Sequence, residues 1–367
     1  MKSEFPDLLQ GSGARSWAQI LGPAGDDPER ILIPQAAGRR VLVTGAGGFI
    51  GSEMARVLAA SCAERVVLLD ICEQHLFEIA EETGERGVAV LGSVGDRALL
   101  DELFREHRPE WVIHAAALKH VPLTERNPLA AVETNALGTW RVAEAGEAWG
   151  AEKMVLVSTD KAVAPRSIMG AAKRIAELVT LEPSRVRRSS VRLVNVIGSP
   201  GSVAPLFAEQ IAQGGPVTVT HPEARRYFMP LDEVVRLLAQ AITNEDASGV
   251  LIPEPGDTMR ITELAKRMIA ASGREVEIAY TGERPGDKLD EALVGAEERL
   301  DTWATADLRR VVSPRAESLG LHLRALEAAV TARNVAEALR VVGDLVPDYE
   351  PSGVVRGIAA EAALAGR

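Results

Sequence analysis

Short apolar runs, separated by longer stretches of mixed polarity, repeat along the chain from residue 39 onward. The runs lie at residues 41–44, 66–69, 88–91, 111–114, 154–157 and 191–196, and a later one at 250–252 adds a candidate strand. Buried parallel strands give such short continuous runs, with helices between them covering both faces of the sheet. The pattern therefore predicts an α/β fold, a Rossmann-like doubly wound parallel sheet with a smaller C-terminal substrate-binding lobe.

Segments rich in glycine and proline separate regions of regular strand and helix pattern from regions with a less regular pattern. Such segments flank the run at 250–252, where they are expected to form a lobe over the carboxyl ends of the strands. The predicted organisation is an N-terminal arm with little core at 1–38, a nucleotide-binding domain at 39–200 with 227–256 returning to it, a substrate-binding lobe at 201–226 and 257–345, and a loose C-terminal tail at 346–367.

Composition narrows the classes of protein that fit this pattern. The net charge of −11 argues against a nucleic-acid or anionic-membrane surface. No signal peptide is visible, and no apolar run approaches the ~20 residues of a membrane span. The two cysteines, Cys62 and Cys72, give no disulfide framework, which indicates a reducing compartment. We therefore expect a cytoplasmic protein without a membrane span or a metal site.

A glycine-rich turn follows the first predicted strand. Gly45, Gly48 and Gly51 have the spacing G-x-x-G-x-x-G, with Phe49 and Ile50 opening the predicted helix. Glycine allows a sharp turn and close approach of the backbone to a pyrophosphate, while the helix N-terminus attracts the phosphates. Together with the strand before and the helix after, this turn predicts a dinucleotide site.

Acidic and small residues after the next strands complete this predicted site. Asp70 ends the second strand, about twenty residues after the glycines, where an acid binds the adenosine ribose. A carboxylate there would repel a 2′-phosphate, so NAD is favoured over NADP. Asp96 follows the third strand, either beside the adenine or as a helix N-cap. The small residues after the fourth strand would let the cofactor lie close, and they are Ala115, Ala116 and Ala117.

Residues 158–173 carry the strongest chemical signal in the chain. Asp160 and Lys161 stand side by side after a strand-like run, and Lys173 follows on the next predicted helix. A nicotinamide enzyme of this layout usually has tyrosine four residues before that lysine. Here the position holds Met169, which cannot exchange a proton. The segment indicates redox chemistry coupled to elimination, although an isolated Asp-Lys pair is more often a solvated surface turn.

A sugar nucleotide dehydratase would use these groups in defined roles. Hydride leaves carbon 4 for NAD and returns to carbon 6, while a base removes the carbon 5 proton and an acid protonates the carbon 6 hydroxyl. Asp160 fits the acid and Lys161 the base, provided that their surroundings shift both pKa values. Thr159 would pass on the carbon 4 hydroxyl proton in place of Met169, and Lys173 would hold the nicotinamide ribose.

Separate sequence blocks, in order along the chain, carry a resemblance to a known family. The chain resembles the CapD-type polysaccharide biosynthesis family of extended short-chain dehydrogenase/reductases, and within it the UDP-N-acetylglucosamine 4,6-dehydratases with methionine in place of tyrosine. This branch looks like the one that retains the carbon 5 configuration. The blocks lie at 41–53, 114–122, 134–139, 158–163, 195–207, 214–223, 226–229 and 284–289.

The resemblance implies roles for residues outside the glycine and Asp-Lys motifs. Lys119 and His120 would border the sugar, and Asn195 would contact the substrate near its phosphates. Arg226 and Arg284 would pair with the diphosphate, a task suited to a bidentate guanidinium. The matching blocks add two further contacts, with the cofactor at Asn135 and with the substrate at Asp287.

Some features leave alternatives open. Family members usually have Phe-Gly where Leu193 and Val194 stand, glutamate at Asp287, tyrosine at Asp290, and asparagine at Ala164. The principal prediction is an NAD-dependent UDP-N-acetylglucosamine 4,6-dehydratase for surface polysaccharides. A carbon 4 epimerase would not require Asp160 or Lys161, and a catalytically silent NAD-binding regulator would fit Met169. Relatives pair through helices at about 98–107 and 128–149, so a homodimer or larger homo-oligomer is expected.

Overall fold

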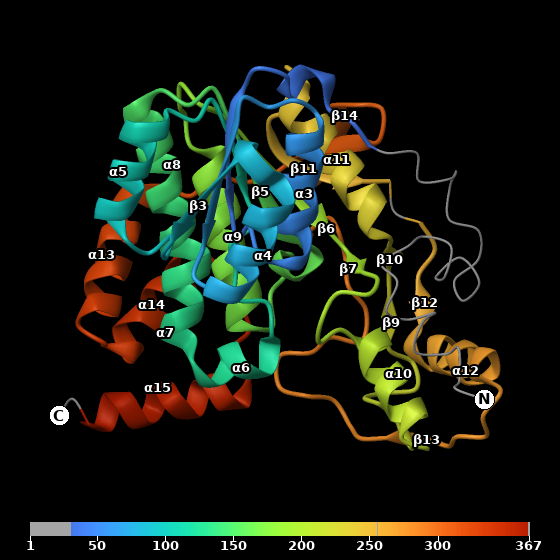
Figure 1. Ribbon diagram of the computed structural model, residues 1–367. Coiled ribbons are helices and arrows are strands. Elements are labelled where there is room, and N and C mark those ends of the chain that lie inside the picture. Colours follow the sequence, from blue (N-terminus) through green and yellow to red (C-terminus); the bar gives the residue numbers. More distant parts are fainter. Residues whose placement is uncertain (1–30, 255, 366–367) are drawn as a thin grey trace.

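A nine-stranded sheet, mostly parallel, forms the centre of the protein (Figure 1). The computed structural model describes residues 31–254 and 256–365. The parallel strands are β1 (Arg40–Thr44), β2 (Arg65–Asp70), β3 (Gly87–Leu91), β4 (Trp111–His114), β5 (Lys153–Thr159), β6 (Arg187–Leu193) and β11 (Gly249–Pro253). Each predicted strand coincides with or overlaps one of them, so the predicted α/β class is confirmed.

The order of the strands creates one topological switch point. The sheet runs β14-β15-β11-β6-β5-β4-β1-β2-β3, and β1 lies between β2 and β4. Thr44, at the end of β1, pairs with Leu69 on one side and His114 on the other. Chain connections diverge on either side of β1, and doubly wound sheets bind ligands in the crevice that this leaves at the carboxyl ends of the strands. The predicted cofactor residues follow these strand ends.

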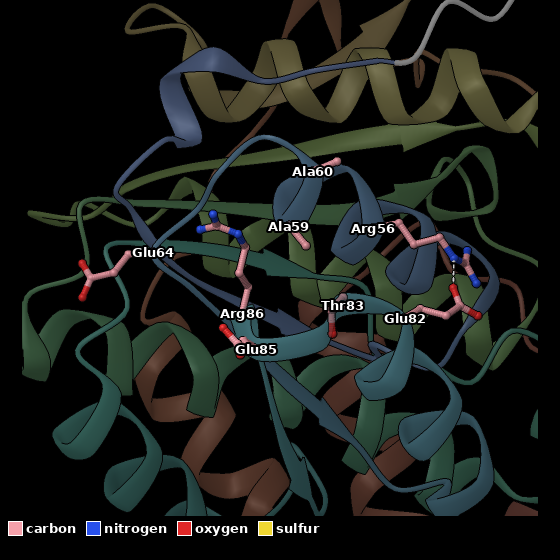
Figure 2. Close-up of a pocket in the computed structure, with 8 residues that line it drawn as sticks. All are labelled: Arg56, Ala59, Ala60, Glu64, Glu82, Thr83, Glu85 and Arg86. Atoms are coloured by element: carbon pink, nitrogen blue, oxygen red, sulfur yellow. Dashed lines mark hydrogen bonds and ion pairs between the residues drawn. The ribbon is translucent and has the colours of Figure 1, made fainter.

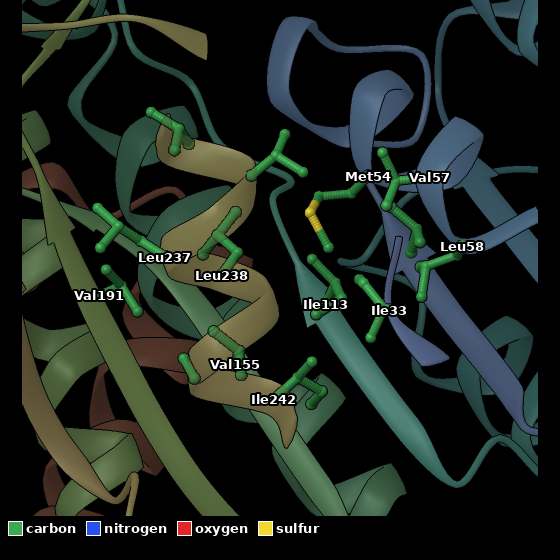
Figure 3. Close-up of a cluster of buried hydrophobic side chains, with 14 of the residues drawn as sticks. Ile33, Met54, Val57, Leu58, Ile113, Val155, Val191, Leu237, Leu238 and Ile242 are labelled. Atoms are coloured by element: carbon green, nitrogen blue, oxygen red, sulfur yellow. The ribbon is translucent and has the colours of Figure 1, made fainter. Parts of the chain in front are cut away.

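Helices cover both faces of the sheet and bury it. One face is covered by α3 (Phe49–Ala60), α4 (Glu73–Thr83) and α11 (Leu231–Thr243), and the other by α5 (Arg97–His107), α8 (Gly138–Trp149) and α9 (Ile168–Leu181). On the first face, Met54 and Leu58 of α3 cluster with Ile113 of β4 and Leu238 of α11 (Figure 3). Burial on both sides explains why the strands are continuous apolar runs in the sequence.

A smaller lobe beside the sheet has its own core. It consists of β7 (Asn195–Val196), α10 (Val203–Ala212), β8 (Val217–Val219), β9 (Arg225–Arg226), β10 (Phe228–Met229), β12 (Met259–Arg260), α12 (Ile261–Ser272) and β13 (Ile278–Tyr280). Phe207, Ile211 and Met268 are buried in it. The apolar run at 191–196 is divided, because β6 ends at Leu193 in the main sheet whereas β7 pairs with β10.

The C-terminal quarter of the chain differs from the prediction. The main sheet is extended by β14 (Arg299–Trp303) and β15 (Leu308–Val312), which run antiparallel to their neighbours, and three helices follow, namely α13 (Leu319–Thr331), α14 (Val335–Leu345) and α15 (Gly353–Ala365). Leu319, Leu323 and Leu326 join the core beneath α8 and α9. The assignment of 257–345 to the lobe is therefore wrong from β14 onward.

The predicted loose tail is also wrong. α15 packs against α14 and against α6 (Val121–Arg126), as Figure 1 shows. Val355 is buried in the same core as α13. The segment 353–365 is therefore a helix packed on α14 and α6 rather than a loose tail. None of the helices within the described ranges is long and apolar enough to cross a membrane.

The predicted N-terminal arm can be assessed only in its last residues, because 1–30 lie outside the described residues. Ile33 is 1% exposed, and its N–H donates to Ser61 Oγ at 2.8 Å. The short 3₁₀ helix η1 (Pro34–Ala36) buries Ala36 in the cluster formed by α3 and α11. Ile33 and Ala36 thus join the core of the main domain, and that the arm has little core of its own stays a prediction.

A fully buried arginine joins the sheet, a helix and the segment before β14. Arg192 of β6 donates to both carboxylate oxygens of Glu177 on α9, at 2.9 and 2.8 Å, and to both oxygens of Glu298, at 2.6 and 2.8 Å. Its last donor binds Leu293 O at 2.8 Å, so all five N–H groups have acceptors. Ser158 of β5 donates to Glu177 at 2.7 Å. Both Arg192 and Glu177 are 0% exposed.

We expect Arg192→Met to lower the free energy of unfolding by about 3–5 kcal/mol, because it leaves two buried carboxylates with Arg174 as their single remaining guanidinium. The midpoint of urea unfolding at constant slope measures the change. Arg340→Met is the matched control, since Arg340 also forms ion pairs but lies exposed on α14. Its midpoint should stay at the wild-type value. Equal midpoints for the two variants would contradict the expectation.

Acid should weaken this network at a predictable pH. Burial raises the pKa of Glu298, but hydrogen bonds and the charge of Arg192 outweigh burial and lower that pKa from 4.5 to about 2. The folded carboxyl therefore holds its proton less tightly than the unfolded one. Its contribution to stability is present above pH 4.5 and is lost as the pH falls toward 2. In Glu298→Gln, the free energy of unfolding, measured by chemical denaturation, should fall less steeply between these pH values than it does in the wild type.

Candidate functional site

The glycine turn after β1 has the geometry of a nucleotide cradle. Gly45 has φ of +66°, and a Cβ there would lie 2.7 Å from the backbone of Ala116. A Cβ on Gly51 would lie 2.1 Å from Gly45 O, so only glycine lets the first turn of α3 pack on the loop. Gly48 caps α3 without a side chain, and Phe49 opens the helix. The helix N-terminus therefore stays open toward an anion.

Asp70 braces this loop from the neighbouring strand. Its Oδ2 accepts from Gly47 N at 2.9 Å, and its Oδ1 accepts from Cys72 N at 2.8 Å. The carboxylate is half-buried at the end of β2. The structure thus brings the predicted ribose-binding acid beside the glycine turn and gives it a second role in holding that turn.

Asp96 occupies the helix-cap position that was one of its two interpretations. It is the N-cap of α5, and its Oδ1 accepts from Leu99 N at 3.0 Å. The residue is exposed. The cap accounts for the carboxylate, while the adenine contact stays a prediction.

The loop after β4 is held by an asparagine in a π-helical turn. Asn135 lies in η3 (Val132–Leu137), where the helix is locally widened. Its Oδ1 accepts from Leu118 N at 2.8 Å, and its Nδ2 donates to Leu118 O at 2.9 Å. Ala115 and Ala116 are half-buried beside Gly45, and Ala117 is exposed. Asn135 therefore fixes the loop on which the predicted cofactor contacts lie.

A buried histidine beneath this loop was not predicted as functional. His114 Nδ1 lies 2.6 Å from Thr44 Oγ1, and its Nε2 lies 2.9 Å from Thr139 Oγ1. Thr139 donates to Asn135 O at 2.8 Å, which requires His114 Nε2 to carry the hydrogen. Burial, aided by the charge of Lys173, lowers the pKa of His114 to about 3. The imidazole is therefore a neutral link between β1, β4 and α8.

Asp160 and Lys161 form a close pair at the carboxyl end of β5. They open the 3₁₀ turn η4 (Asp160–Ala162), and Asp160 Oδ1 accepts from Lys161 Nζ at 2.9 Å. Thr159 Oγ1 also donates to that oxygen, at 2.9 Å. The Asp160 side chain is 0% exposed and Lys161 is 25% exposed. The pair is thus buried at a strand end rather than solvated in a surface turn.

A second carboxylate beside Lys161 was missed from the sequence. Glu291 Oε1 lies 3.6 Å from Lys161 Nζ, and Asn195 Oδ1 accepts from the same ammonium at 3.3 Å. Burial lowers the pKa of Lys161, but the charges of Asp160 and Glu291 outweigh it, so the pKa is raised above its usual value. The only signal for Glu291 in the sequence is its place just after the block at 284–289.

Helix α9 carries the other predicted catalytic residues. Met169 and Lys173 are each 4% exposed, one turn apart, so both face the interior. Burial lowers the pKa of Lys173 to about 8, although Glu177 one turn further acts in the opposite direction. The helix is capped by Ser167, which accepts from Gly170 N at 3.1 Å. The cap fixes where α9 begins beside η4.

The predicted substrate residues fall into three groups. Asn195 and Arg226 lie beside the Asp160–Lys161 pair, but Arg226 donates to the carbonyls of residues 225, 288 and 289 at 2.7 to 2.8 Å. Lys119 donates to Ser199 Oγ and Pro200 O. The other predicted substrate residues are His120, whose ring lies against Gly201, and Arg284 and Asp287, which form an ion pair of 3.0 Å with each other. Diphosphate binding by the arginines stays a prediction.

A surface hollow of about 780 Å³ lies at the opposite end of the strands (Figure 2). It is bounded by the C-terminal halves of α3 and α4 and by the 3₁₀ turn η2 (Gly84–Arg86). Its lining residues are Arg56, Ala59, Ala60, Glu64, Glu82, Thr83, Glu85 and Arg86. Because the glycine turn precedes α3, this hollow is separate from the candidate site.

The fold and the site define the class of protein. The protein is an extended short-chain dehydrogenase/reductase. It has the parallel sheet of that class, a glycine turn after β1, an acid at the end of β2 and the Asp160–Lys161 pair after β5. The family described as Polysaccharide biosynthesis protein matches residues 41–312. The chain belongs to this family.

Similar proteins agree with this membership. The chain is 43% identical over 273 residues to the probable polysaccharide biosynthesis protein EpsC of Bacillus subtilis (strain 168), covering 71% of this chain and 46% of EpsC. It is 42% identical to the capsular polysaccharide biosynthesis protein CapD of Staphylococcus aureus, covering 75% of this chain and 49% of CapD. The chain thus spans about half the length of these relatives.

Other relatives are named as sugar nucleotide epimerases. The UDP-glucose 4-epimerase of Rickettsia rickettsii (strain Sheila Smith) is 33% identical, covering 74% of this chain and 82% of that protein. Among solved structures, Pen from Bacillus thuringiensis has a TM-score of 0.70 at 27% identity, covering 77% of this chain and 91% of Pen. The UDP-glucose 4-epimerase of Thermus thermophilus in complex with NAD has a TM-score of 0.61 at 27% identity, covering 68% of this chain and 88% of that protein.

We expect Asp70→Ala to weaken NAD binding about tenfold or more, since hydrogen bonds to a charged group contribute about 1.5–3 kcal/mol. The variant loses the carboxylate that fixes Gly47 N and Cys72 N. Titration calorimetry measures the affinity. Glu73→Ala, an exposed carboxylate on the first turn of α4, is the control and should bind NAD as the wild type does. Unchanged affinity in Asp70→Ala would refute the role.

Proposed function

We propose that the protein is an NAD-dependent sugar nucleotide 4,6-dehydratase that converts UDP-N-acetylglucosamine to a 4-keto-6-deoxy sugar nucleotide for surface polysaccharides. One observation carries the proposal. The buried carboxyl of Asp160 lies 2.9 Å from the ammonium of Lys161, which is partly exposed at the end of β5. Elimination of water needs an acid and a base near each other, and this pair supplies both.

The proton count of this pair fits the chemistry. Dehydration needs a protonated Asp160 and a neutral Lys161, whereas the isolated groups favour the ionised pair. The two forms differ only in the position of one proton between Lys161 Nζ and Asp160 Oδ1. Neutral Lys161 would then take the carbon 5 proton, and Asp160 would protonate the departing carbon 6 hydroxyl. The required states therefore cost no exchange of protons with solvent.

The acid must regain its proton after water leaves. Oxidation at carbon 4 comes before elimination, while Asp160 still holds its proton, so the carbon 4 hydroxyl proton would pass through Thr159 Oγ1 to water. Thr159 Oγ1 donates to Asp160 Oδ1 at 2.9 Å, so a proton can return to Asp160 by the same route after elimination. Met169 lies on α9 and cannot perform this transfer. The geometry thus supports a route that replaces the usual tyrosine.

The residues around the glycine turn fit NAD as the cofactor, which would accept hydride from carbon 4 and return it to carbon 6. Only glycine at position 45 leaves room beside Ala116, as a backbone close to a pyrophosphate requires. The carboxylate of Asp70 favours a free ribose hydroxyl over a 2′-phosphate. Lys173, buried with a lowered pKa of about 8, would hold the nicotinamide ribose.

Epimerisation at carbon 4 is the second candidate, favoured by the relatives named as UDP-glucose 4-epimerases. It exchanges hydride at carbon 4 and needs no acid for carbon 6. The buried Asp160–Lys161 pair would then be unexplained. A silent NAD-binding regulator would leave it equally unused.

A homodimer or larger assembly remains part of the proposal. The helices expected to mediate pairing are α5 and the stretch 128–149, which comprises α7 (Pro128–Ala131), η3 and α8. Glu327 of α13 already binds Arg97 of α5 and Arg141 of α8, at 3.1 and 2.9 Å. Any pairing through these helices must therefore include or surround α13.

We expect incubation with UDP-N-acetylglucosamine to yield a product lighter by one water. Mass spectrometry of the reaction mixture measures this change. A new isomer of unchanged mass would instead establish epimerisation, and no product with any UDP-sugar would support the regulator. Lys161→Ala should abolish water loss, and Asp160→Asn should slow it by about 10²–10⁴-fold. NAD binding and thermal unfolding of both variants serve as controls. Wild-type turnover in either variant would refute the assigned roles.

A further inference from the structure

Glu291 is a buried carboxylate held among three cations. It lies between the block at 284–289 and β14, and its side chain is 3% exposed. Its Oε1 lies 3.6 Å from Lys161 Nζ and 4.0 Å from Arg226 Nη2, and its Oε2 lies 3.4 Å from Lys288 Nζ. Oε2 is buried without a hydrogen-bond partner. A buried charge is tolerated only when it is paired, and here three cations lie within 4.0 Å of the carboxylate.

The scaffold around Glu291 is itself fixed. Arg226 donates to the carbonyls of Lys288 and Leu289, which anchors the backbone two residues before Glu291. Lys288 Nζ donates to Val163 O at 2.6 Å, which ties the same stretch to the turn after Lys161. The carboxylate of Glu291 is therefore presented to Lys161 from a rigid frame rather than from a mobile surface loop.

We propose that Glu291 is a positioning residue, which holds the Lys161 ammonium beside Asp160 and sets the proton affinity of that pair. This inference rests on the proposed function, in which the pair exchanges one proton. The groups that face Lys161 come from three sides: Asp160 within η4, Asn195 on β7 with Arg226 on β9, and Glu291. Of these charges, two are negative and one is positive.

Removal of Glu291 therefore has a definite sign. An opposite charge within about 4–6 Å favours the charged form of a lysine, so its loss makes Lys161 easier to deprotonate. The positive charge of Arg226, which remains in the variant, also lowers the pKa of Lys161. The limb of the pH profile of kcat/KM that reports deprotonation of Lys161 should move to lower pH in Glu291→Gln, whereas a merely structural defect would reduce turnover without moving it.

The proton affinity of Lys161 can be measured without any substrate. Brief acetylation with acetic anhydride at about pH 9 modifies only neutral lysine, and peptide mass spectrometry reports the rate at each lysine. We expect Lys161 in Glu291→Gln to react about tenfold faster than in the wild-type protein. Lys153, which pairs with Glu245 at the other end of β5, should keep its rate and thereby report on folding.

Two further variants make the test specific. Asp290→Asn removes the same charge from the adjacent residue, which is exposed and does not contact Lys161, so its acetylation rate should equal that of the wild type. Glu291→Asp keeps the charge and should stay close to the wild-type rate. An unchanged rate in Glu291→Gln, or an equal increase in Asp290→Asn, would overturn the proposal. If no sugar nucleotide is dehydrated, the acetylation result still decides the role of Glu291, so the two failures are distinguishable.

Discussion

The buried contact between Arg192, Glu177 and Glu298 is the constraint on which the rest of the structure depends. Arg192 on β6 has all five donors satisfied, chiefly by the two carboxylates, and Arg174 adds a second guanidinium 3.0 Å from Glu177 and 3.2 Å from Glu298. Two positive and two negative charges thus cancel inside the protein. Such a group need not add net stability over an apolar core, but it accepts only one arrangement of its parts. Its value here is the fixed relation between β6, α9 and the chain before β14.

That relation determines where the predicted catalytic groups lie. Ser158, one residue before Thr159, donates to Glu177, so the end of β5 is tied to α9. Glu177 lies one turn after Lys173 on the same helix, and its charge opposes the lowering of the Lys173 pKa by burial. Leu293 accepts from Arg192 two residues after Glu291. The strand that leads to Asp160, the helix with Lys173 and the stretch with Glu291 are therefore held together behind the crevice.

The sequence analysis predicted what depends on local pattern. Continuous apolar runs predicted the parallel strands because both faces are buried, and the glycine spacing before α3 located the turn that Asp70 braces. Features that depend on distant contacts were not predictable. Glu291 meets Lys161 across 130 residues of chain, and a lone glutamate has no spacing signal. The helices α13 to α15 were not predicted to pack on the main domain, because an apolar stripe along a helix does not identify the surface that it covers.

The pair at the end of β5 shows why burial and a partner must act together. A carboxyl buried alone would be protonated and an amine buried alone would be neutral, since low polarity disfavours charge. In contact at 2.9 Å they stabilise each other's charges, and Glu291 strengthens the ionised form further. A sugar ring placed over Lys161 would remove water from the exposed quarter of its side chain. In the proposed function, this desolvation would favour transfer of the proton to Asp160 and would create the acid and the base as the substrate binds.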